Sequence, residues 1–173
     1  SMMSRDVRRA NFNQNSVISY ANSDCTADAA PQADDILVTT CSGKTHLIFG
    51  LDRNWDGDAS DDDGGAFRRN TVVNHSTGEN VGVIEMWTGS GTPDCDDDGD
   101  PAWMQVTDPG FVDVTVFDIQ RPFFDDTIAG AEGTTVTMRN RQVVMTIEGE
   151  VVLDRDIRRH IADRVKVRND SLL

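Results

Sequence analysis

The sequence predicts an α+β fold, in which one N-terminal helix packs on a mostly antiparallel β-sheet that carries long acidic loops. Three observations support this prediction. Residues 3–12 mix apolar and charged side chains as a helix does, and Asn11 supplies a helix stop signal. After residue 33 the sequence consists of short, β-branched runs separated by turn residues. Two Asp-rich stretches, 52–63 and 94–100, interrupt those runs and are predicted to be the loops.

The whole chain, residues 1–173, is predicted to be a single soluble domain, because 173 residues with 38% hydrophobic content can bury one sizeable core. We interpret residues 1–12 as the remnant of a longer helix and expect a hydrophobic, membrane-inserting segment before it. The chain itself has no apolar run near the ~20 residues that a membrane span needs. Its net charge of −14 argues against nucleic acid and anionic membrane surfaces as partners, and suggests a secreted, periplasmic or high-salt setting.

The strands are predicted from β-branched or alternating runs and from the turns between them. Residues 41–44 (CSGK) join the first two runs into a hairpin, 76–80 (STGEN) join the next two, and residues 140–141 are expected to turn a third hairpin. Strict alternation in 111–119 predicts a strand with two opposed faces, and 156–160 is expected to be a short helix or irregular. The predicted strands are 35–40, 45–51, 66–74, 81–88, 111–119, 134–140 and 142–148, with edge pieces at 151–153 and 164–168.

Residues 52–63 (DRNWDGDASDDD) have the spacing of a calcium-binding loop. Alternate side chains in such a tight turn converge their oxygens on one hard cation, and Gly57 permits the sharp bend. The last position holds Asp instead of the longer Glu, and no helices are predicted on either side, so the site would be a calcium loop on a β scaffold. The predicted ligands are Asp52, Asn54, Asp56, Asp58, Ser60 and Asp63.

Residues 94–100 (DCDDDGD) repeat the first half of that pattern. The final ligand position falls on Gln105, which is not a carboxylate, so Asp108 or the first loop would have to complete the site. Crowding so many like charges costs stability unless a cation offsets it or the loops stay solvated. Two hypotheses follow: one or two calcium sites, or two disordered acidic loops tolerated in high salt. The predicted ligands of the second loop are Asp94, Asp96, Asp98 and Asp100.

The three cysteines, Cys25, Cys41 and Cys95, do not have the spacing of a zinc or redox site. In an oxidising compartment the natural arrangement is one disulfide and one free thiol. A Cys25–Cys41 bond would pin a long loop and is the preferred prediction, with Cys41–Cys95 as the alternative. In a cytosolic protein all three would instead be small, partly buried residues.

The sequence predicts no catalytic site. The histidines, His46, His75 and His160, are scattered along the chain. The triplet 43–45 (GKT) does not complete a phosphate-binding loop because the first glycine of that motif is missing, and 89–91 (GSG) lacks the spacing of a nucleophile elbow. We therefore predict that the protein is not an enzyme and takes no small-molecule substrate.

Basic residues gather at the two ends of the chain. Of the 16, three lie in residues 5–9 and eight in 139–168, and 14 of them are Arg. Arg pairs with carboxylates through two parallel hydrogen bonds, which Lys cannot do. The two ends are therefore predicted either to contact acidic surfaces of other proteins or to form solvated charged faces.

The two ends and the middle of the chain together resemble minor pilins and minor pseudopilins of the PilW-like and type II secretion J-type kinds. In that group the N-terminal helix continues into a D-x-R-R-A segment, and the chain closes on a V-x-V/L-R-N strand. Residues 103–119 (WMQVTDPGFVDVTVFDI) resemble the strand region that lies between them. The end motifs are matched by Asp6, Arg8, Arg9 and Ala10, and by Val165, Val167, Arg168 and Asn169.

The resemblance implies a pilin-like fold and a structural role in a filament. The protein would be an inner-membrane prepilin of a Gram-negative bacterium, facing the periplasm, trimmed by a peptidase, and held in the membrane by its N-terminal helix. It would join a type IV pilus, a mannose-sensitive-haemagglutinin-type pilus or a type II secretion pseudopilus, with sister minor subunits as partners. Arg5, Arg8 and Arg9 would face those neighbours. The alternative is a secreted, calcium-dependent adhesion or carbohydrate-binding module.

Overall fold

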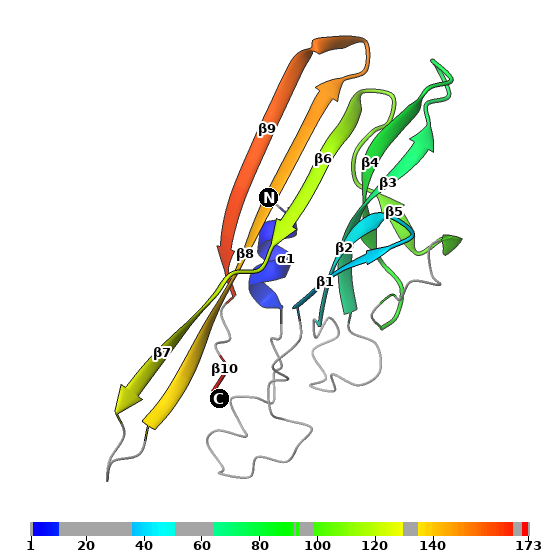
Figure 1. Ribbon diagram of the computed structural model, residues 1–173. Helices are drawn as coiled ribbons and strands as arrows, with labels where there is room; N and C mark the ends of the chain where they lie inside the picture. The colour runs from blue at the N-terminus through cyan, green and yellow to red at the C-terminus, as the bar shows by residue number, and fades with distance from the viewer. Residues whose placement is uncertain are drawn as a thin grey trace.

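The computed structural model consists of two antiparallel β-sheets and one short helix, α1 (Met2–Arg9), in the part of the chain that it describes (Figure 1). The predicted α+β class is therefore wrong, because the described residues are mostly strand. The helical pattern ends after eight residues, and segments near the C-terminus that are expected to turn or to form a helix extend a sheet instead. The structure describes residues 2–10, 36–50, 64–91, 93, 99–129, 135–167 and 171–172.

The first sheet contains β1 (Ile36–Cys41), β2 (Lys44–Gly50), β3 (Gly64–Val73), β4 (Asn80–Trp87) and β5 (Trp103–Gln105). Each strand is antiparallel to the next, in chain order. The turn between β1 and β2 has φ of 50° at Ser42 and 78° at Gly43, the left-handed geometry that matches the twist of a hairpin. In the turn between β3 and β4, Asn74 Oδ1 accepts hydrogen bonds from the backbone N–H groups of Ser76 and Thr77. Both predicted hairpins of this region are confirmed.

The second sheet contains β6 (Val112–Gln120), β7 (Phe123–Ala129), β8 (Thr135–Val151), β9 (Asp154–Lys166) and β10 (Ser171–Leu172). The 17-residue strand β8 lies in its centre. β7 and β10 pair with the first part of β8, and β6 and β9 pair with the second part. The result is a long, narrow sheet in which β7 and the start of β8 project as an arm (Figure 1).

The third predicted hairpin and the short helix are both wrong. The chain runs straight through 140–141 within β8, because Arg141 is buried and the residues around it stay paired with neighbouring strands. The interruption falls in the partner strand instead, at Pro122 between β6 and β7, since proline has no N–H to donate to a ladder. The chain turns at 152–153, and residues 154–166 return along β8 as β9.

Strand β6 contains a β-bulge between Val114 and Val116, so the strict alternation predicted for this segment fails. The core-facing residues are Val114, Phe117 and Ile119, so two residues lie between the first pair and one between the second. At the bulge the carbonyl oxygen of Val114 accepts a hydrogen bond of 2.5 Å from Nε of Arg69 in the first sheet. The irregularity therefore supplies a contact that joins the two sheets.

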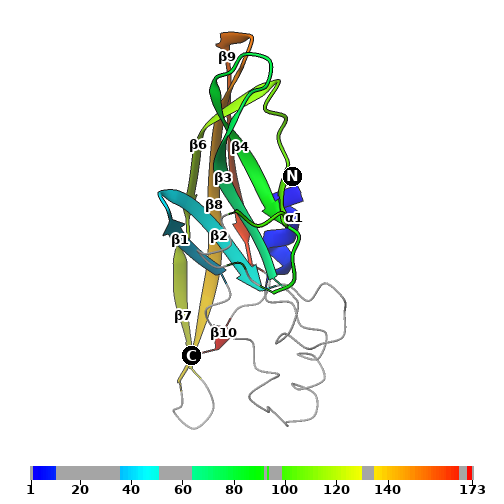
Figure 2. The ribbon, with the colours of Figure 1, turned by 90° about the vertical axis from the view of Figure 1, so that its right-hand side faces the viewer.

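Helix α1 and the two sheets, whose arrangement Figure 2 shows, enclose the larger hydrophobic cluster of the described residues, and a smaller one lies around Trp87 and Trp103. Helix α1 lies against β9 and buries Met3, Val7 and Ala10, as expected for a helix with one apolar side. Val7 and Ala10 are therefore buried as predicted, whereas Phe12 lies outside the described residues. Because the apolar side of α1 is buried, only its opposite, charged face is available for contacts with other molecules.

Candidate functional site

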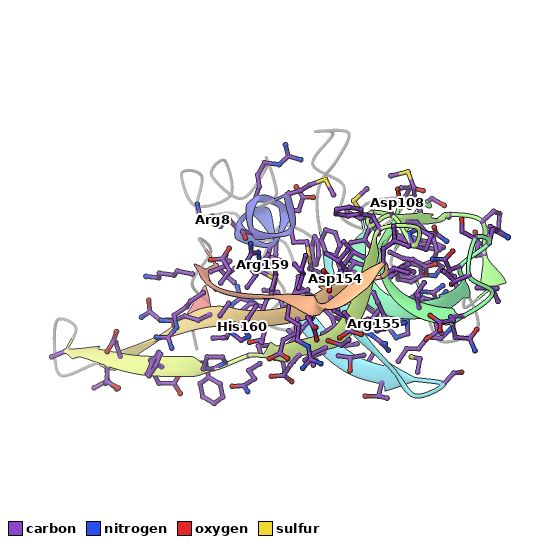
Figure 3. The ribbon with its side chains drawn as sticks, turned by 90° about the horizontal axis from the view of Figure 1, so that it is seen from above. Arg8, Asp108, Asp154, Arg155, Arg159 and His160 are labelled. Carbon is purple, nitrogen blue, oxygen red and sulfur yellow. The ribbon has the colours of Figure 1, made fainter. Side chains whose placement is uncertain are left out.

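Helix α1 presents arginines to solvent on the side away from the core. Arg5 and Arg8 are exposed, and Arg8 lies beside the sheet in the view from above (Figure 3). Nε of Arg5 lies 3.1 Å from Oδ1 of Asp6, an exposed ion pair that contributes little to stability. The side chain of Arg9 lies outside the described residues. No helix in the described ranges is long and apolar enough to cross a bilayer.

The helix is attached to the second sheet by a buried polar contact as well as by its apolar side. Ser4 is buried, and its hydroxyl donates a hydrogen bond to Oδ2 of Asp163 on β9. Val7, one turn further on, is completely buried in the same core. Together these contacts fix the orientation of α1 and hence the direction in which Arg5 and Arg8 point.

Strand β9 is a basic, solvent-exposed edge of the second sheet. Its sequence (DRDIRRHIADRVK) holds five basic and three acidic residues, and nearly all its side chains are exposed. Arg159 and Arg164 make no ion pair within the described residues, and both are exposed. The predicted edge piece 164–168 finds only the end of this strand, because the exposed residues before it have no apolar alternation to reveal them.

Arg155 joins the two sheets near the turn between β8 and β9 (Figure 3). Its guanidinium donates hydrogen bonds to Glu150, to Asp113 Oδ2 at 3.0 Å and to Glu79 Oε2 at 2.9 Å. These bonds, that to Glu150 first, raise the pKa of Arg155 and keep it charged. Asp113 Oδ1 accepts a further bond of 2.7 Å from the backbone N–H of Gly82. The cluster therefore ties β4 and the turn before it to β6, β8 and β9.

A second charged pair is buried inside the first sheet. Arg68 on β3 and Glu85 on β4 are cross-strand partners, with Nε and Oε2 2.7 Å apart and side chains only 2% and 6% exposed. Asn70 Nδ2 donates to the other carboxylate oxygen at 3.0 Å. The guanidinium lies 4.0 Å from the centroid of the Trp103 ring, which packs edge-on against Trp87. This arrangement holds β5 on the sheet and is structural, because the pair is inaccessible to a partner.

The predicted calcium loops fall almost entirely outside the described residues. Asp100 is the exception: it is exposed, and its Oδ1 accepts a hydrogen bond of 2.7 Å from the N–H of Ala102. Asp108, considered above as a completing ligand, accepts a similar bond from Gly110. Within the described ranges no cluster of His, Cys, Asp or Glu could hold a metal. Outside them lie Asp52, Asn54, Asp56, Asp58, Ser60, Asp63, Asp94, Asp96 and Asp98.

Cys41, at the end of β1, is one half of a disulfide. The chain has three cysteines, so its partner is Cys25 or Cys95, and both of these lie outside the described residues. The bond agrees with an oxidising compartment. The pairing of Cys41 with Cys25 stays a prediction.

The three histidines lie on separate elements and do not converge. His46 is buried on β2, with its ring centroid 5.6 Å from that of Trp103. His75 is exposed in the turn between β3 and β4. His160 lies on β9, with Nδ1 3.1 Å from Oε1 of Glu148.

Residues 1–167 match the family model described as prepilin peptidase-dependent protein B. The chain belongs to this family. The match includes α1 and every strand except β10, and it confirms that the chain is pilin-associated, as its resemblance to minor pilins predicts. The particular kind of minor pilin stays a prediction. Neither a search of curated proteins nor a search of solved structures finds a significant match.

Proposed function

We propose that this chain is the extracytoplasmic domain of a minor pilin or minor pseudopilin, a non-enzymatic subunit of a type IV pilus or of a type II secretion pseudopilus. The proposal rests on the family match over residues 1–167, which covers nearly the whole chain. The partners are other subunits of the same filament. The PilW-like and J-type kinds, and a mannose-sensitive-haemagglutinin-type pilus, are the finer assignments that the end motifs favour.

The surface of α1 supports an assembly role. A subunit needs a contact face that stays rigid while neighbours bind it, and the buried Val7 together with the Ser4–Asp163 hydrogen bond holds this helix in place. Arg5 and Arg8 then project from a fixed frame. Because a guanidinium recognises carboxylates through two hydrogen bonds, these arginines suit an acidic face on a neighbouring subunit.

We place the chain in the periplasm of a Gram-negative bacterium before assembly, anchored in the inner membrane by a segment upstream of α1. The family description, with its dependence on a prepilin peptidase, supports this placement. The disulfide at Cys41 supports it independently, because such bonds persist in oxidising compartments.

We also propose that the loop 52–63 binds calcium, with 94–100 as a second, weaker site. The support is the ligand spacing in the sequence and the repulsion that the crowded carboxylates would suffer without a cation. A calcium-dependent loop on an assembled subunit would make filament assembly or adhesion respond to calcium outside the cell.

Complementation of a deletion strain tests the assembly role. The strain receives the wild-type gene, the variant Arg5→Glu/Arg8→Glu, or the control His75→Glu, which adds negative charge in an exposed turn away from α1. We expect the arginine variant to lose filaments or secretion while its purified domain melts like wild type, and the control to assemble. Normal assembly by the arginine variant would overturn the assigned contact face.

A further inference from the structure

We propose that copies of this chain associate edge to edge, with β7 of one copy pairing with β9 of the next. The inference concerns the second sheet and does not depend on the proposed filament role. It adds a parallel ladder between copies to the antiparallel ladders that β8 makes with each of these strands within one copy.

Both strands are open edges. In the described part of the chain β8 alone pairs with β7, and β8 alone pairs with β9. They lie on opposite sides of β8, because β6, which continues into β7, and β9 pair with the same residues of β8. The outer N–H and C=O groups of such edges are templates for another strand, most of all when the edge is long and carries apolar side chains.

The two edges carry opposite charge. β7 (FFDDTIA) holds two acidic and no basic residues, whereas β9 holds five basic and three acidic ones. Asp125 and Asp126 are adjacent and therefore lie on opposite faces of β7. Arg159 and Arg164 are an odd number of residues apart and lie on opposite faces of β9. Pairing of the two strands thus offers a carboxylate and a guanidinium on each face of the joined sheet.

Exposed apolar side chains accompany the charges on both edges. On β7, Phe123 and Phe124 are 56% and 55% exposed. On β9, Ile157 and Ile161 are 45% and 58% exposed. Aromatic and β-branched residues on neighbouring strands are favourable cross-strand partners. The edge contact would therefore cover apolar surface that a single copy leaves in water.

The arrangement predicts an open series of copies. The contact joins two different surfaces, so when two copies pair, one keeps a free β9 and the other keeps a free β7, and each of these edges can take a further copy. β7 and β9 are both antiparallel to β8 and hence parallel to each other, so a neighbour can pair without reversing its direction. The net charge of −14 repels copies from one another, which makes association dependent on the local match of charge at the edges.

Sedimentation velocity of the purified chain over a range of concentrations tests the proposal. One variant, Asp125→Arg/Asp126→Arg, reverses the β7 edge, and the other, Arg159→Glu/Arg164→Glu, reverses the β9 edge. We expect wild type to form oligomers that grow with concentration, and each variant alone to associate about tenfold more weakly or worse. An equal mixture of the two variants should restore association, because every edge then meets the opposite charge again.

The variant His75→Glu is the control, because it adds negative charge in an exposed turn of the first sheet, outside both edges, and it should associate like wild type. If the helix variant Arg5→Glu/Arg8→Glu fails in filament assembly but keeps this association, the two proposals are separated. Three results would overturn the edge contact: a wild-type chain that stays monomeric, reversed variants that associate normally, or a mixture that does not recover. Recovery on mixing also shows that neither reversed variant is misfolded.

Discussion

Replacing Arg68 by Met should destabilise the protein strongly, because it leaves the buried carboxylate of Glu85 in the first sheet without its ion-pair partner. Glu85 is buried and would keep only the hydrogen bond from Asn70 in place of its ion pair. Breaking a buried ion pair by removing one partner costs about 3–5 kcal/mol. Loss of the guanidinium from above Trp103 adds about 0.5–2 kcal/mol, part of which the apolar Met side chain offsets. We expect a loss of about 4 kcal/mol in the free energy of unfolding.

Neutralising the unpaired Glu85 should recover much of the lost free energy of unfolding. The second substitution, Glu85→Gln, removes the charge and keeps an oxygen that can accept the hydrogen bond from Asn70. In the Arg68→Met background it should return at least about 2 kcal/mol, whereas alone in the wild type it should destabilise. The sign of its effect therefore depends on whether Arg68 is present.

Urea unfolding measures both effects, followed by tryptophan fluorescence and far-ultraviolet circular dichroism in parallel. Trp87 and Trp103 lie beside the pair and report on it directly. Coincident transitions by the two probes are needed before a free energy is assigned. A loss below about 1 kcal/mol for Arg68→Met, or a further loss when Glu85→Gln is added to it, would show that the pair is not buried as described.

Three further predictions concern the helix, the loops and the disulfide. Val7→Ala should lower the free energy of unfolding by about 2 kcal/mol in thermal unfolding, since it leaves a cavity at a filled core position. The control Met2→Ala, at an exposed position of the same helix, should lower it by under about 0.5 kcal/mol. Equal losses would mean that the helix is not docked. Calcium at a hundredfold excess over Kd should add about 2.7 kcal/mol of stability, magnesium much less, and Asp56→Ala should remove most of the gain. Identical shifts with calcium, magnesium and matched ionic strength would reduce the effect to screening. Non-reducing peptide mapping should recover Cys41 joined to Cys25, a bond worth on the order of 3 kcal/mol; a peptide joining Cys41 to Cys95 would refute this pairing.

Strands β1 to β4 of the first sheet are the part of the fold that the sequence predicts well, whereas β5 is not predicted. These four strands are short and β-branched, and the turns carry recognisable residues, such as Gly43 between β1 and β2. These signals are local, so periodicity and turn residues predict the hairpins without information on which other strands they pair with. The apolar side of α1 is equally local, and Val7 and Ala10 are buried as expected.

The second sheet is not predictable in the same way, and the predicted α+β class is wrong for this reason. Most of strand β9 is charged and exposed, so its periodicity reveals only the last residues, 164–166, which fall in the predicted edge piece 164–168. The bulge after Val114 breaks the alternation of β6, and Arg141 reads as a turn residue although it is buried within β8. The ion pair of Arg155 with Glu79 joins residues 76 positions apart, a contact set by the packing of the two sheets. Short end motifs predict the pilin association, but they carry no information on these long-range contacts.

Mass spectrometry of filaments sheared from cells tests the structural role most directly, with cells that lack the prepilin peptidase as the comparison. We predict that the chain is present in the filament fraction of wild-type cells in a processed form, beginning at a peptidase-cut N-terminus upstream of α1. In peptidase-deficient cells it should stay unprocessed in the membrane fraction. A chain released free into the medium, with filaments of normal composition that do not contain it, would contradict the assignment and favour a secreted module.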